Sequence, residues 1–194
     1  VGFKSLESQT TAANNTAVGY EALKDTTSGG ENTAVGLQAL TSNTTGYGNV
    51  AVGYAALDAS TTATDNTAVG RDSLTNNIAN NNTAVGKSAL QANTSGHSNV
   101  AVGKNALQAN TTGNQSVAVG LGALNSNTTA TANVAVGAGA LSTVTTAADN
   151  VAMGRAALYN STAANNTAIG SLSLYLNTTG TQNSGCGRGS LQSN

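Results

Sequence analysis

Side chains able to carry out chemistry are few in this chain, and none recurs at a catalytic spacing. There is one histidine, His97, one cysteine, Cys186, and eight Asp or Glu residues. No pair of carboxylates repeats, and no Ser or Cys stands with a base in an arrangement used for nucleophilic catalysis. His97 and Cys186 have no further ligands nearby, so the sequence predicts no metal site, no disulfide and no cofactor. We therefore expect a protein that is not an enzyme.

Recurring Val-Gly pairs are the next candidates, as a loop that binds phosphate. Such a loop needs a strand, several closely spaced glycines and a following helix. Here each pair contributes a single regularly spaced glycine, and the segment that follows it is too short to form a helix. The pattern favours a glycine that forms a corner.

The charge balance excludes two classes of partner. Seven Lys and Arg against eight Asp and Glu give a net charge of −1. This predicts no nucleic-acid binding and no attraction to anionic lipid. No apolar run approaches the ~20 residues that span a bilayer, so we expect no membrane insertion in this segment.

Five of the seven basic residues follow a repeated glycine directly, in a column that also holds aromatic residues. One interpretation is a solvated ridge on which any residue is tolerated. The other is a stripe that binds glycans or an anionic matrix. Its candidate residues are Tyr20, Tyr54, Arg71, Lys87, Lys104, Arg155 and Arg188.

A second column of candidates consists of threonines. A regular Thr ladder on a flat face is typical of ice-binding solenoids, whereas a ladder in a turn only stabilises the coil. The candidate ladder comprises Thr27, Thr44, Thr61, Thr111 and Thr128. Both interpretations stay open from the sequence.

The element that positions these columns is a repeat. A glycine preceded by an apolar residue occurs twelve times at a spacing of 17, with two steps of 16, from Gly2 to Gly187. A fixed period of this size indicates a solenoid. It also excludes the disorder that 3% aromatic residues and many Asn, Thr and Gly would otherwise favour.

Two further columns hardly vary. A leucine stands four residues after each glycine, and an asparagine stands four residues before nearly every glycine, Ser116 being an exception. We expect stacked leucines in the core and an Asn ladder whose amides bond from coil to coil. Representative members are Asn32, Asn49, Asn66, Asn99, Leu40, Leu57 and Leu107.

The alternating stretch from Asn49 to Gly53 predicts a short strand. We expect Val50 and Val52 to face the core and Ala51 to face outward, close to a second chain. After the glycine corner, the leucine segment is too short for a helix, which needs ~12 residues. The segment from Asn43 to Gly46 is predicted to be a turn. The fold class is therefore all-β, a parallel β-solenoid (β-roll) of twelve coils of 16–17 residues, in a single array over residues 1–194. With ~4.8 Å between coils, the rod would be roughly 55 Å long.

The segments Asn99-Val100-Ala101-Val102-Gly103 and Ser116-Val117-Ala118-Val119-Gly120 resemble the head repeats of YadA-like trimeric autotransporter adhesins and similar repeats of phage tail fibres. The resemblance covers every coil. It implies a left-handed β-roll, assembled as a homotrimer on a bacterial surface. The coils here are longer than the family's usual ones, and the invariant leucine and the Asn-Thr-Thr-Gly turn are additions.

These observations predict a structural or adhesive extracellular fibre segment on a cell surface or virion. Its rod would display a surface for attachment to host, matrix or glycan, and ice binding is the alternative. Val1 enters within a strand and Asn194 leaves within a turn, so we expect part of a longer fibre. The expected self-association is a homotrimer or an end-to-end filament.

Overall fold

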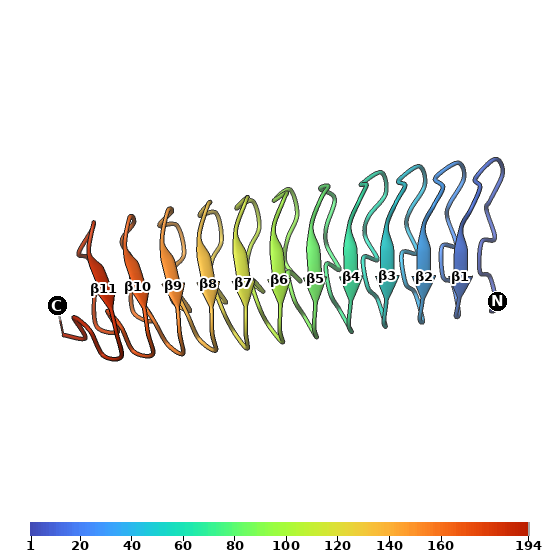
Figure 1. Ribbon diagram of the computed structural model, residues 1–194. Coiled ribbons are helices and arrows are strands. Elements are labelled where there is room, and N and C mark those ends of the chain that lie inside the picture. Colours follow the sequence, from blue (N-terminus) through green and yellow to red (C-terminus); the bar gives the residue numbers. More distant parts are fainter. Residues whose placement is uncertain (194) are drawn as a thin grey trace.

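The computed structural model describes residues 1–193. It contains one parallel sheet of eleven strands, which are stacked in the order of the chain (Figure 1). Each strand has three residues. Neighbouring strands pair in register, as Ala101 does with Ala118. The strands are β1 (Thr16–Val18), β2 (Thr33–Val35), β3 (Val50–Val52), β4 (Thr67–Val69), β5 (Thr83–Val85), β6 (Val100–Val102), β7 (Val117–Val119), β8 (Val134–Val136), β9 (Val151–Met153), β10 (Thr167–Ile169) and β11 (Ser184–Cys186). The predicted β-solenoid is confirmed.

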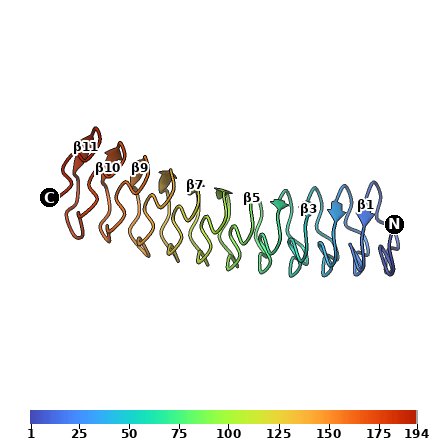
Figure 2. The same ribbon diagram turned by 90° about the horizontal axis from the view of Figure 1, so that it is seen from below.

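The coils form an elongated rod with the chain ends at opposite tips, as two perpendicular views show (Figures 1 and 2). Each interval between the twelve repeated glycines supplies one strand. The two short intervals leave the pairing intact: Val69 still lies opposite Val85, and Met153 lies opposite Ile169. The missing residue is therefore absorbed in a loop and not in the sheet.

The expected direction of the strand side chains is wrong. Ala51, at the centre of β3, is fully buried, whereas Val50 and Val52 on either side of it are half-buried and point outward. The same burial pattern holds along the sheet, and Val18 and Ile169 are 44% and 43% exposed. Threonines at the first strand position also point outward. The strands therefore contribute alanine, and not valine, to a core that they share with the leucines.

The space inside the coil explains this inversion. At the centre of β11 stands Gly185, where an added Cβ would lie 3.3 Å from Cγ of Leu174 and 2.7 Å from Oγ of Ser173. The strand therefore packs directly on the leucine row across a narrow interior. A methyl group fills that gap, and a branched side chain would overpack it.

The repeated leucines confirm the predicted core and adopt an unexpected backbone. Leu40, Leu57 and Leu107 are fully buried. All twelve leucines have φ between 49° and 55°, in the left-handed region. A leucine there costs about 1–2 kcal/mol of local strain. This bend turns the chain sharply while the Leu107 amide still donates to the Ala123 carbonyl of the next coil at 3.0 Å.

Two rows of asparagines run through the interior. In the predicted row, the Oδ1 atom of Asn32 accepts from the backbone amide of Asn49 at 3.0 Å and from its side-chain amide at 3.1 Å. The row continues through Asn66, Asn82 and Asn99, all fully buried. Ser116 replaces one member and still links to its neighbours, because its amide donates to Asn99 Oδ1 at 3.0 Å.

The second row was not predicted from the sequence, because its asparagines fall in the segment that was expected to be a turn. Asn43, Asn93, Asn110 and Asn127 are fully buried. Asn110 donates to Asn93 Oδ1 at 2.7 Å, and Asn127 donates to Asn110 Oδ1 at 2.8 Å. Amide chains along the rod thus satisfy most of the buried polar interior.

Candidate functional site

The predicted ridge is a continuous line along the rod. Its members follow the corner glycines, and the backbone bonds stack them: the Tyr20 carbonyl accepts from Gln38, and the Lys87 carbonyl accepts from Asn105. The seven predicted residues of this ridge are therefore aligned on one edge of the molecule. Arg71 and Arg155 are exposed, and Tyr20 and Tyr54 are 45% and 46% exposed.

The first coils of the ridge are aromatic and apolar. Phe3 and Tyr20 stack with ring centroids 5.6 Å apart, and Leu37 between Tyr20 and Tyr54 is 45% exposed. The guanidinium of Arg71 lies 5.5 Å from the centroid of the Tyr54 ring. Such ring faces can stack on sugar rings, and cations further along can contact anionic groups.

The Thr ladder uses its hydroxyl protons within the protein. Thr27 Oγ1 donates to the Thr44 carbonyl at 3.1 Å, and Thr44 Oγ1 donates to the Thr61 carbonyl at 3.0 Å. Thr111 and Thr128 donate to the next coil in the same way. Each of these four hydroxyls is therefore held by the backbone and offers only its acceptor lone pairs to a ligand.

A third surface was not recognised from the sequence. We call it the sheet face: the outward side chains of the first and third residues of β1 to β11. The first position holds Thr, Val or Ser, and the third holds Val, Met, Ile or Cys, so none of these residues is charged. The alternation of apolar residues was visible, but alanine and valine are both apolar, so polarity alone could not indicate which set faces inward.

The sheet face is bordered by the ridge on one side and by a second row on the other. We call the second row the acidic row: the residues two positions before each strand. It contains Glu31, Asp65 and Asp149 among neutral residues and has no cation. All three carboxylates are exposed, and all three residues have φ near 60°. Their spacing gave no signal, because neutral residues separate them in the sequence.

One carboxyl group on another side of the rod is perturbed. Burial raises the pKa of Asp58 above its ordinary value of 3.8, and the nearby carboxylates of Asp25 and Glu21 raise it further. A hydrogen-bonding interaction with Thr41 opposes this shift. No group of three or more His, Cys, Asp or Glu residues within residues 1–193 could hold a metal ion.

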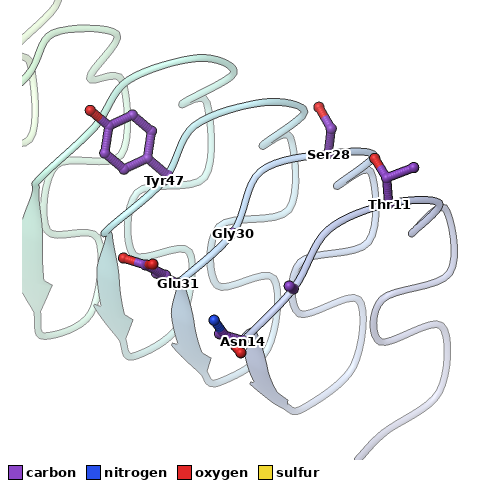
Figure 3. Close-up of a pocket in the computed structure, with 7 residues that line it drawn as sticks. Thr11, Asn14, Ser28, Gly30, Glu31 and Tyr47 are labelled. Atoms are coloured by element: carbon purple, nitrogen blue, oxygen red, sulfur yellow. The ribbon is translucent and has the colours of Figure 1, made fainter.

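A shallow pocket of about 350 Å³ lies over the loops of the first three coils (Figure 3). Glu31 and Tyr47 stand on one side of it, and Thr11 and Asn14 stand on the other. Tyr47 is 53% exposed. One carboxylate beside hydroxyl groups can accept and donate hydrogen bonds, but no buried polar group is directed into the depression to hold a ligand.

The remaining reactive residues lie apart. Cys186 is a free, exposed thiol at the third position of β11, and His97 lies on a loop with Nδ1 3.2 Å from Ser98 Oγ. None of the residues from 1 to 193 forms a helix with the length and apolarity needed to cross a bilayer. No protein-family model, no curated protein and no solved structure matches this chain.

Proposed function

We propose that this chain is a rigid segment of an extracellular fibre, on a cell surface or a virion, and that it works by structure and attachment rather than by catalysis. The observation that carries the proposal is the unbroken stack of eleven in-register strands over one continuous core. Such a stack gives length and stiffness with few buried residue types, which suits a spacer.

The ridge is the proposed attachment surface, for a host surface, an extracellular matrix or a glycan. Its residues vary from coil to coil, and it contains exposed rings followed by cations. Phe3, Tyr20 and Tyr54 offer ring faces, whereas Lys87 and Lys104 offer charge and form no ion pair within residues 1–193. An anionic polysaccharide lying along the rod would meet both kinds of contact.

A binding experiment tests the ridge directly. The rod is passed over an immobilised sulfated polysaccharide, and its retention is measured as the salt concentration rises. We expect retention that the double variant Lys87→Glu and Lys104→Glu loses, because the ridge then repels the polymer. The matched control reverses charge away from the ridge, at Lys24→Glu, and should bind like the unmodified protein.

Equal retention of the ridge variant and the control would contradict the attachment proposal. A thermal-hysteresis measurement on the same preparations covers the ice-binding alternative. The internal bonds of Thr27, Thr44, Thr111 and Thr128 do not favour that alternative, so we expect no hysteresis. Hysteresis lost on replacing these threonines would support ice binding instead.

A further inference from the structure

The sheet face is an uncharged strip between two rows of opposite charge. The acidic row has three carboxylates and no cation, whereas the ridge has five cations and no carboxylate. The strip itself exposes valine and threonine, with Val35 and Met153 at 36% and 42%. A long, uncharged strip of valines and threonines with this frame is typical of a surface that another macromolecule covers.

At two of the strands, a carboxylate of the acidic row and a cation of the ridge flank the same strand. Asp65 and Arg71 flank β4, and Asp149 and Arg155 flank β9 in the same way. All four side chains are exposed. The members of each pair are six positions apart in the sequence, up to about 20 Å along an extended chain, and the strand lies between them, so they border the face on opposite sides.

This arrangement is complementary to itself. A two-fold axis parallel to the rod, passing above the strand centres, turns a second copy over so that its ridge lies above the first copy's acidic row. Asp65 of each copy then faces Arg71 of the other, and Asp149 faces Arg155. Reversing the direction of the second copy would instead place ridge against ridge, with like charges opposed.

We propose that two copies of this chain pack face to face through their sheet faces, parallel and related by this two-fold axis. Four intermolecular ion pairs result, two at β4 and two at β9, on either side of the apolar strip. Arg71 contacts Asp72 through Nε at 3.1 Å, and in this pairing its other guanidinium nitrogens would donate to Asp65 of the second copy. The inference goes beyond the proposed function, which a single rod could also fulfil.

The available area is sufficient for a stable pair. Eleven strands at ~4.8 Å, with the flanking rows up to about 20 Å apart, span an area of up to about 1,000 Å² per copy. Specific interfaces bury about 800 Å² per partner.

Charge complementation tests this pairing. One variant carries Asp65→Lys and Asp149→Lys, and the other carries Arg71→Glu and Arg155→Glu. In each variant, both borders of β4 and β9 carry the same charge, so like charges face each other in its dimer. We therefore expect the dimer dissociation constant to rise roughly tenfold or more. An equimolar mixture should regain dimers, because every changed position then faces its opposite charge. Masses are measured by sedimentation velocity.

The apolar strip is tested separately. We expect Val119→Lys, at the third position of β7, to dissociate the dimer, whereas Thr112→Lys on an exposed loop should leave it unchanged. Circular dichroism melts confirm that each variant is folded. A monomeric unmodified protein at all concentrations, a trimeric mass, or no recovery of dimers on mixing would each overturn the two-fold pairing. Polysaccharide retention and molecular mass are separate measurements. Failure of the pairing proposal therefore leaves the attachment proposal to be judged by retention alone, and the reverse also holds.

Discussion

At the corner of each coil, glycine is required for two separate reasons. Gly103 has φ of 133°, and a Cβ there would lie 2.5 Å from the carbonyl oxygen of Gly120 in the next coil. Gly122 also has positive φ, at 61°, but an added Cβ meets nothing within 4 Å. Backbone geometry alone therefore does not account for the corner, and close stacking of coils supplies the second constraint.

We expect Gly103→Ala to destabilise the rod by about 2–5 kcal/mol, from backbone strain and overpacking together. Gly122→Ala is the matched control and should cost about 1 kcal/mol, because only the strain applies. Chemical denaturation followed by circular dichroism measures both. Equal losses for the two variants would show that coil contact at the corner is unimportant.

The raised pKa of Asp58 predicts a stability that depends on pH. Since its pKa is raised on folding, the folded state holds a proton more tightly than the unfolded chain. The free energy of unfolding therefore falls as the pH rises from 3.8 through the raised folded pKa, and the loss remains at neutral pH. We expect Asp58→Asn to be more stable than the unmodified protein at neutral pH and equal to it below 3.8.

The control for this titration is Glu31→Gln, which changes an exposed carboxyl on another side of the rod. It should leave the denaturation midpoint unchanged at both pH values. A stability gain for Asp58→Asn that is the same at acidic and neutral pH would contradict the assignment to Asp58.

At the scale of the elements, repetition in the sequence specified the coil, the corner and the leucine row. It did not specify the inward face of the strand. In β3, Ala51 lies inside and Val50 outside, against the expectation, because the narrow interior selects for volume once polarity is equal. The left-handed leucines were equally invisible, since non-glycine residues at positive φ have no sequence signature.

The second Asn row is interrupted at two places, and at each interruption a buried side-chain oxygen lacks a hydrogen-bond partner. Asn43 Oδ1 and Asn127 Oδ1 have no hydrogen-bond partner within the part of the chain that the structure describes. In each case the next coil holds a residue without an amide, Ser60 or Val144. Ser60 Oγ is itself buried and unpaired. A missing amide donor thus leaves an acceptor unsatisfied one coil earlier.

Ser60→Asn should repair one break. The new side-chain amide can donate to the unpaired Oδ1 of Asn43 in the preceding coil, as Asn110 does to Asn93 at 2.7 Å, and its own oxygen can accept from Asn77. We expect a gain of about 1–2 kcal/mol in the free energy of unfolding. Ser60→Ala is the control, because it removes the orphan hydroxyl without supplying a donor. A gain no larger than that of the control would mean that the amide chain adds nothing at this position.

At the scale of the whole molecule, the rod is a one-dimensional assembly. Strands contact only their neighbours in the stack, and every inward row passes from coil to coil at the same register. Stability is therefore close to a sum of coil and interface contributions. Whole coils should then be removable, because the cut ends present the same surfaces to one another.

Deleting residues 103–119 removes one full period and joins Val102 to Gly120, so that β6 pairs directly with β8. We expect a folded rod that has lost about 1–3 kcal/mol of unfolding free energy, the share of 17 residues. Deleting only residues 103–110 removes Gly103 and Leu107 and leaves the rest of that coil out of register, so the stack should divide or unfold. Circular dichroism and denaturation distinguish the two. The two variants retain most of the same residues and differ chiefly in whether the leucine and asparagine rows still align. If the half-period deletion were as stable as the full-period deletion, register would not be the constraint that organises the rod.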